Sequence, residues 1–263
     1  MRVLTTIEEL RHQRDIAVER GERVGLVPTR GDLHDGHAAL LRVAHAQCDV
    51  VVCSIVRPDG TPAVHVRDDE RIAAAAGTDI LWRPAPGPLD RNARLRVVPR
   101  DRADLADVAT ADAHLLNLLR PSVVYVGDGH FDHARILSDI ARELMTGNVE
   151  VRVVESPRDP AGLALGAATS SLDQAGREAA GAVPRALTAV VDSVAAGEHS
   201  LFRLRARAEA YLAEAGVLLE VEDVATVDPQ SHDPIDLFDR DVLMVVRARV
   251  GDIPIVDSRL LTR

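Results

Sequence analysis

Residues 24–44 read VGLVPTRGDLHDGHAALLRVA, and this stretch decides the class of fold. The apolar segment 23–29 has the length and composition of a short buried strand, which we expect Pro28 to end. Residues 37–48 then place apolar side chains at helical spacing. Glycines and polar residues separate the two segments. The stretch therefore predicts a strand, a tight turn and a helix, the first half of a βαβ unit.

The same alternation continues as far as residue 156. The run DVVVCSIV at 49–56 is continuously apolar, which is typical of a parallel strand buried on both faces. Thr6, with Glu9 three residues later, predicts the start of the first helix, and Gly21 predicts its end. These patterns indicate an α/β fold with a doubly wound parallel sheet. We expect further helices at 69–77, 102–121 and 131–147, and further strands at 78–84, 121–127 and 149–156.

The composition changes at SPRDPAG, residues 156–162, where two prolines within five residues indicate a hinge. The pattern beyond it predicts helices at 172–195 and 201–216 and strands at 218–227, 242–250 and 253–257. The Gly-Asp pair at 251–252 is typical of a hairpin turn. We therefore expect a Rossmann-like domain over residues 1–156 and a smaller α+β domain over residues 157–263.

Composition narrows the possible ligands. The chain has a formal net charge of −10 and only 2% aromatic residues, so we expect no nucleic acid partner. All 31 basic side chains are arginine, which excludes chemistry that needs a lysine amine. Two cysteines do not make a disulfide framework, and no apolar run reaches about 18 residues. We expect a cytoplasmic protein without a membrane partner.

The turn RGDLHDGH carries the first candidate site. Gly31 and Gly36 allow the backbone to approach a ligand closely. Asp35 or Gly36 is placed to cap the following helix, so that free N–H groups at its start can bind phosphate. His34 and His37, three residues apart, can donate hydrogen bonds to phosphate oxygens as negative charge builds. We take these two histidines as the catalytic candidates.

The stretch VGLVPTRGDLHDGHAALLRVA resembles the opening of the pantothenate synthetase (pantoate–β-alanine ligase) family, which has the H-x-G-H signature of the nucleotidyltransferase group. DVATADAHLLNLLRPSVVYVGDGHFDH, DPAGLALGAAT and ARVGDIPIVDSRLL extend the resemblance along most of the chain. It implies an amide-forming reaction that uses ATP and Mg²⁺: pantoate reacts to an acyl adenylate, and the amine of β-alanine then displaces AMP. It also implies a homodimer through the N-terminal domain, for which the LLNLL segment is a candidate.

The resemblance also implies roles for individual positions on the acid side of the site. Arg30 stands where the family has methionine, and Arg57 stands at the asparagine of an N-P-x-Q stretch. The two glutamines that hold the acid in the family correspond to Gly60 and His133. These four residues are the acid-binding candidates, and the two arginines suit a carboxylate or a phosphate.

The phosphate side departs further from the family. The G-E-K-D-[YF]-Q-Q stretch corresponds to residues 127–133, so Gly129 stands at the family's lysine. The L-S-S-R stretch corresponds to residues 165–168, which lack both hydroxyls and the arginine. The implied nucleotide-binding positions are Arg30, Gly31, Gly36, Gly127, Asp128, Gly129, His130, Leu165, Gly166, Ala167 and Ala168.

These departures leave three functions open. The first is an ATP-dependent ligase for pantoate or an analogue and β-alanine, with reduced or altered activity. The second is a catalytically inactive homologue that regulates or scaffolds. The third is a metal-binding enzyme, because His34, His37, His130 and His133 would suit a transition metal if the two loops face one cleft.

Overall fold

The computed structural model describes residues 1–57, 64–85, 89, 94–100, 102–144, 148–166, 169, 171–229 and 231–263. Contacts divide the chain into two compact units. The first unit comprises Met1–Gly127 and Asp132–Glu155, and the second comprises Asp128–Phe131 and Ser156–Arg263. A short segment after Gly127 therefore belongs to the second unit. The expected domain boundary between residues 156 and 157 stays a prediction.

The first unit is built on a six-stranded sheet in the order β1-β4-β3-β2-β5-β6, and every neighbouring pair is parallel. The expected doubly wound α/β fold is confirmed. Long runs of valine, isoleucine and leucine suit these strands because helices cover both faces of the sheet. The strands are β1 (Arg2–Leu4), β2 (Val24–Thr29), β3 (Val50–Ile55), β4 (Ile80–Trp82), β5 (Val123–Gly127) and β6 (Glu150–Val154).

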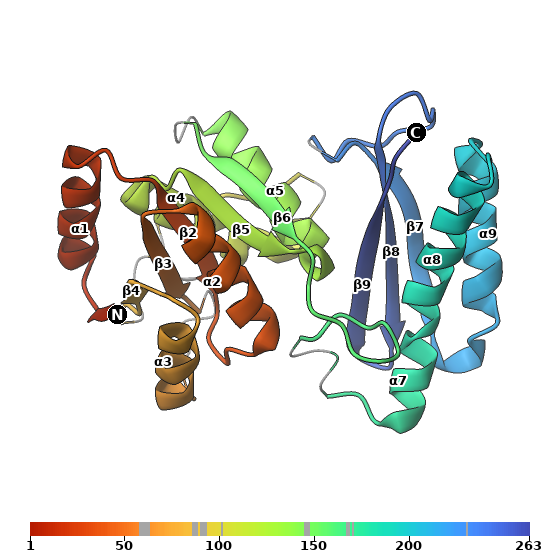
Figure 1. Ribbon diagram of the computed structural model, residues 1–263, viewed down its shortest axis with the longest axis horizontal. Helices are drawn as coiled ribbons and strands as arrows, with labels where there is room; N and C mark the ends of the chain where they lie inside the picture. Colours follow the sequence, from red (N-terminus) through yellow and green to blue (C-terminus); the bar gives the residue numbers. More distant parts are fainter. Residues whose placement is uncertain are drawn as a thin grey trace. The chain divides into compact units, whose positions relative to one another are not determined.

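Two groups of helices cover the sheet (Figure 1). One apolar cluster joins α1, α4 and α5 to one face, and another joins α2 and α3 to the opposite face. Thr6 caps α1 in a capping box with Glu9, as its sequence predicts. The helices are α1 (Ile7–Glu19), α2 (Asp35–Gln47), α3 (Val66–Ala75), α4 (Ala106–Leu119) and α5 (Phe131–Glu143), with the 3₁₀ turn η1 (Ala103–Leu105). The 3₁₀ turn η2 (Asp128–His130), which precedes α5, belongs to the second unit.

Two details of the sheet differ from the expectation. Strand β1, at the edge beside β4, had no sequence signal because it is only 3 residues long. Pro28 does not end β2, which continues to Thr29. The ladder with β5 covers only Gly25 and Leu26, whereas the ladder with β3 covers the whole strand. The proline therefore lies beyond the pairing with β5 and interrupts neither ladder.

The second unit packs helices α8 and α9 against an antiparallel sheet in the order β7-β8-β9 (Figure 1). Gly181 divides the expected helix at 172–195 into α7 and α8. Gly251 has a φ of 58° in the hairpin between β8 and β9, as the Gly-Asp pair predicts. The elements are α7 (Gln174–Ala180), α8 (Ala182–Ala195), α9 (Leu201–Ala213), η3 (Gly216–Leu218), β7 (Glu220–Val227), β8 (Val242–Val250) and β9 (Ile253–Leu261).

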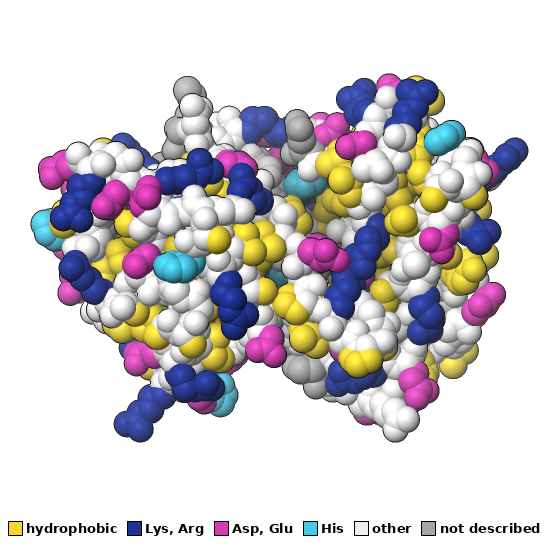
Figure 2. All heavy atoms as spheres, viewed as in Figure 1, with side chains coloured by type: hydrophobic (Ala, Val, Ile, Leu, Met, Phe, Trp, Pro, Cys, Tyr) yellow, Lys and Arg dark blue, Asp and Glu magenta, His cyan; other side chains and the backbone are white. Residues whose placement is uncertain are grey.

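The surface carries charges of both signs. On the face drawn in Figure 2, arginine side chains alternate with aspartate and glutamate rather than gathering in one basic patch. Many arginines of the described chain form ion pairs, such as Arg23 with Glu150 at 3.1 Å. No helix in the described part of the chain is long and apolar enough to cross a membrane.

Candidate functional site

The candidate site of the first unit lies where the winding of the sheet reverses. The connection after β2 leads to β3 on one side, and the connection after β5 leads to β6 on the other. Strands β2 and β5 are neighbours, so the crevice outside their carboxyl ends is the topological switch point. His34 and His37 follow β2, and His133 follows β5. The fold thus places these histidines at one edge of the sheet.

A buried aspartate shapes the turn that follows β2. Gly31 and Asp32 have φ angles of 87° and 54°, so both adopt the left-handed conformation. Asp69 on α3 is 1% exposed, and its carboxylate accepts the backbone N–H groups of Asp32 (3.2 Å) and Leu33 (2.6 Å). A Cβ on Gly31 would lie 3.1 Å from the same carboxylate. Only glycine therefore fits this position without displacing the aspartate.

His34 caps helix α2, whereas we expected Asp35 or Gly36 to do so. The His34 Nδ1 accepts the N–H of Gly36 at 3.2 Å, and the Nδ1 of His37 accepts the N–H of His34 at 3.4 Å. Asp35 is the first residue inside the helix instead. The imidazoles replace the usual carboxylate or hydroxyl because their Nδ1 atoms reach the same N–H groups.

These bonds determine the tautomer of both rings. An Nδ1 that accepts a hydrogen bond carries no proton, so in the neutral ring Nε2 carries the hydrogen and donates. The ring centroids of His34 and His37 lie 4.0 Å apart. Burial lowers the pKa of His34, and the nearby Asp35 opposes that shift. His34 is therefore neutral near neutral pH, and the accepting Nδ1 atoms leave Nε2 of both rings to donate.

The two arginines predicted to bind the acid follow the neighbouring strands β2 and β3. Arg30 is exposed at the end of β2. Arg57 follows β3, and its guanidinium lies 3.6 Å from the carboxylate of Asp32. That carboxylate also lies 4.0 Å from Nε2 of His65. The predicted Gly60 lies outside the described residues.

His133 is joined to an acid that sequence reasoning missed. Its Nε2 lies 2.7 Å from Oδ2 of Asp112 on α4. The neighbouring Asp132 forms an ion pair with Arg102, which also contacts Asp104 at 2.9 Å. Gly127 is the last residue of β5 and is buried. The beginning of α5 is therefore tied to α4 by one histidine–carboxylate contact.

In the second unit, the carboxylate of the predicted nucleotide-binding residue Asp128 is hydrogen-bonded to other residues of the same unit. It is 8% exposed, and its carboxylate accepts Arg158 Nη2 at 2.7 Å and the N–H of Ser156 at 3.0 Å. The same guanidinium binds Asp257 on β9 at 2.7 Å. The carboxylate of Asp128 thus anchors η2 to β9, which leaves backbone N–H groups as the better candidates for a phosphate.

The remaining predicted positions of this unit lie in two short segments. Gly129 and the exposed His130 belong to η2. Leu165 and Gly166 lie in a turn held by Thr169, whose Oγ1 accepts the N–H of Gly166 at 3.0 Å. Ala167 and Ala168 lie outside the described residues.

The four-histidine metal hypothesis gains no support. Among the residues that the structure describes, no group of three or more His, Cys, Asp or Glu side chains is arranged to hold a metal ion. His34 and His37 use Nδ1 for backbone contacts, and His133 uses Nε2 for Asp112.

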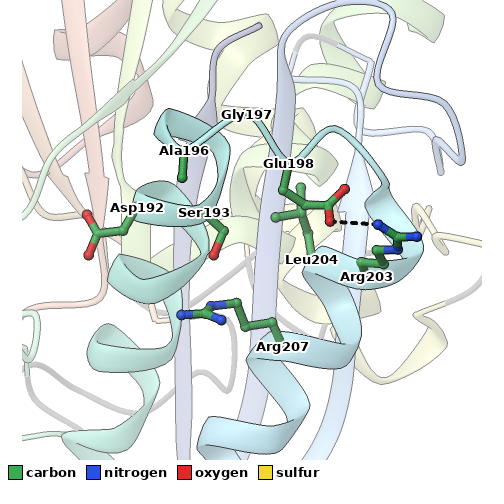
Figure 3. Close-up of a pocket in the computed structure, with 8 residues that line it drawn as sticks. All are labelled: Asp192, Ser193, Ala196, Gly197, Glu198, Arg203, Leu204 and Arg207. Carbon is green, nitrogen blue, oxygen red and sulfur yellow. Dashed lines mark hydrogen bonds and ion pairs between the residues drawn. The ribbon is translucent and has the colours of Figure 1, made fainter.

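A hollow of about 600 Å³, which no predicted site residue lines, lies between the end of α8 and the start of α9 (Figure 3). Arg203 pairs with Glu198 at 3.4 Å across its rim, and Arg207 donates to the carbonyl of Ala189. Arg205, on the same helix, pairs with Asp236 at 3.3 Å. Each of these arginines has an intramolecular partner, so the helix presents no cluster of unpaired cations.

The buried acids Asp69 and Asp112 were missed for different reasons. Asp69 lies in the first turn of α3, where acids are common because they favour the helix dipole, so nothing marked it as buried. Asp112 falls on the apolar stripe of α4, three residues after Ala109 and four before Leu116. That acid within an apolar stripe is a signal that sequence reasoning had available.

A doubly wound parallel sheet with an H-x-G-H turn at its switch point defines the Rossmann-like nucleotidyltransferase class of fold. The family model described as pantoate-beta-alanine ligase matches residues 2–60 and 63–260. The chain is 33% identical to the pantothenate synthetase of Rhizobium johnstonii, over 99% of this chain and 92% of that relative. It is 30% identical to that of Marinobacter nauticus, over the whole of both chains. The chain belongs to the pantoate–β-alanine ligase family.

Solved structures support the same fold. The pantothenate synthetase of Thermus thermophilus superposes with a TM-score of 0.83 and 26% identity, over 98% of this chain and 99% of that one. The pantoate-beta-alanine ligase of Francisella tularensis, solved with beta-gamma ATP and beta-alanine, has a TM-score of 0.69 over 99% of this chain and 97% of that one. At 19% identity, this second likeness concerns the fold alone.

Proposed function

We propose that the protein is an ATP-dependent ligase that joins pantoate, or a related hydroxy acid, to β-alanine through an acyl adenylate. Family membership supports the reaction class, and the names of the relatives supply the substrates. The Francisella tularensis relative was solved with beta-gamma ATP and beta-alanine, which are the nucleotide and amine in this proposal.

One observation carries the proposal: the N-terminal turn of α2 presents two imidazoles as donors at the switch point. The Nδ1 atoms of His34 and His37 are held by backbone N–H groups, which puts the hydrogen of each ring on Nε2, the atom that would donate to the phosphates of ATP. Negative charge builds on the phosphates as the acid attacks. Donors already in position there need little reorganisation and favour the transition state.

The other contacts follow from position and charge. Arg30 and Arg57 carry the positive charge that attracts the carboxylate of the acid. Gly31 and Gly36 allow the backbone to approach the nucleotide. In the second unit, Gly129, His130, Leu165 and Gly166 would contribute mainly backbone groups. Mg²⁺ would accompany the phosphates of ATP, where this ion is usually held, and no side chain of this chain is assigned to it.

Complementation of a pantothenate auxotroph tests this function. The wild-type gene is expected to rescue growth. His34→Ala is expected to abolish rescue, and the matched variant His12→Ala, which removes an exposed histidine on α1, is expected to leave it intact. Purified protein should show acid-dependent exchange of pyrophosphate into ATP. Absence of both rescue and exchange, with folded protein, contradicts the proposal.

A second candidate is an inactive homologue that regulates or scaffolds. The residues that favour it are Gly129 and Gly166, because glycine offers no side chain to a phosphate at the positions where the resemblance to the family implies lysine and serine. Losing one charge-assisted contact costs about 1.5–3 kcal/mol. Failed rescue together with co-purification of an active homologue would support this alternative, whereas rescue by the chain alone contradicts it.

We also propose a homodimer through the first unit, although not through the leucines of LLNLL. Leu115, Leu116, Leu118 and Leu119 are each 9% exposed or less, because they pack into the core of their own unit. An interface must therefore use other residues. Light scattering after size-exclusion chromatography tests the state directly, and a monomer at micromolar concentration contradicts this proposal.

A further inference from the structure

His133 and Asp112 form a dyad between two helices of the first unit. The His133 Nε2 and the Asp112 Oδ2 lie 2.7 Å apart. The Asp112 side chain is 9% exposed, and the imidazole is 19% exposed. Asp112 comes from the buried face of α4, and His133 lies in the first turn of α5. The pair thus combines a buried carboxylate with a more accessible imidazole.

The carboxylate determines which nitrogen of His133 is basic. An ionised carboxylate only accepts hydrogen bonds, so Nε2 must carry the hydrogen between them. The lone pair of the neutral ring is then on Nδ1, which has no hydrogen-bond partner among the residues that the structure describes. If Nδ1 takes up a proton, the adjacent carboxylate stabilises the imidazolium, as an aspartate does beside a catalytic histidine.

The dyad lies at the edge of the sheet where a ligand is expected. His133 follows β5 at the switch point, opposite the turn that carries His34 and His37. Those two histidines present protonated Nε2 atoms and use Nδ1 for the backbone, so they are donors. Among the three, His133 alone presents a lone pair rather than a hydrogen. The three histidines therefore have complementary proton roles.

We propose that His133 is the base that deprotonates the amine in the amide-forming step, and that Asp112 is its positioning residue. The proposal rests on the proposed ligase function and adds a residue to its second step. An amine such as β-alanine is an ammonium near neutral pH and has no lone pair with which to attack. A base beside it supplies the reactive form.

The step balances as follows. The ammonium transfers one proton to Nδ1 of His133, and the freed lone pair forms the C–N bond to the acyl carbon. The C–O bond to AMP breaks, and its electron pair leaves with the phosphate oxygen. The adduct loses its second N–H proton to water, and the imidazolium returns its proton to solvent. Products are the amide, AMP and two protons.

A purely structural role predicts a different outcome. A buried ion pair adds little net stability, yet removing one partner leaves the other uncompensated. The proposed reaction has two half-reactions, formation of the acyl adenylate and formation of the amide. If the dyad only joined α4 to α5, its loss would change stability or would slow both half-reactions together. A base acts on the amine alone. The two half-reactions therefore separate the roles.

The experiment measures both half-reactions in His133→Gln, Asp112→Asn and the control Asn117→Ala, which changes an exposed residue of α4. Glutamine can still bond to the aspartate but cannot take a proton. We expect acid-dependent pyrophosphate exchange within about threefold of wild type, and amine-dependent AMP release about 100-fold slower in His133→Gln. Asp112→Asn should slow the same step by about tenfold or more. Hydroxylamine, which is unprotonated at neutral pH, should restore the rate of His133→Gln.

Several results would overturn the proposal. AMP release by His133→Gln at the wild-type rate, an equal loss in both half-reactions, or no rescue by hydroxylamine each contradict a base. If a single variant misfolds, the paired substitution Asp112→Leu and His133→Leu removes both polar groups together and keeps the test open. Wild-type protein that shows neither half-reaction contradicts the ligase function itself, which is a distinct outcome from loss of the amine step alone.

Discussion

Replacing Asp69 tests whether a buried carboxylate holds the turn that carries His34. Its two oxygens accept the N–H groups of Asp32 at 3.2 Å and Leu33 at 2.6 Å. In Asp69→Asn, the amide oxygen keeps the shorter bond and its NH₂ group faces the other N–H. One donor is left unsatisfied, which costs about 1–3 kcal/mol. In Asp69→Ala both bonds are lost, and we expect a decrease of about 2–5 kcal/mol in the free energy of unfolding.

Urea unfolding followed by tryptophan fluorescence measures this loss. Trp82 is the single tryptophan of the chain and is fully buried in β4, so its emission reports on the first unit. Asp68→Asn is the matched control: its ion pair with Arg71 spans 3.5 Å between side chains that are 66% and 72% exposed. We expect that control to change stability by less than about 0.5 kcal/mol. An Asp69→Asn variant as stable as Asp68→Asn refutes the reasoning.

Three further predictions concern other buried groups. Because burial lowers the pKa of His34, the unfolded chain binds a proton at this imidazole more tightly than the folded chain does. The stability of the fold should therefore fall as the pH drops below about 6.5. His34→Asn, a cap that does not titrate, should lessen this fall in pH-dependent melting curves. Burial raises the pKa of the Cys53 thiol to about 12, so native protein should react with a thiol reagent only at Cys48, and two reactive thiols in native protein would contradict this. Arg158→Met removes the guanidinium that the buried carboxylates of Asp128 and Asp257 share, and calorimetry should show the second unit destabilised by about 3–5 kcal/mol. The control Arg203→Met, at a 75% exposed side chain, should have little effect. Equal melting temperatures for the two variants would argue against a stabilising role of the Arg158 ion pairs.

Local patterns were enough to predict the elements. Alternating apolar strands and amphipathic helices predicted the parallel sheet, since each pattern depends only on neighbours along the chain. The Thr6 capping box was predicted for the same reason. The turn before α2 was predicted less well, because its cap is a histidine and the usual preferences favour Asp35.

Long-range contacts are what the local patterns could not supply. Pro28 was expected to end its strand because proline has no N–H to donate. That loss matters only where a neighbouring strand needs the hydrogen bond, and the pairing with β5 already ends at Leu26. The leucines of LLNLL looked available for a partner, but their exposure depends on which residues of the same unit cover them.

The sequence by itself determined the class of fold, the H-x-G-H turn and the family, because these are properties of residue order and local spacing. Only the tertiary structure decided the partners of the acids: Asp69 with the turn after β2, Asp112 with His133, and Asp128 with Arg158. These partners lie 36, 21 and 30 positions apart along the chain. A buried charge must find a partner wherever the fold brings one near, and residue spacing does not say where that is.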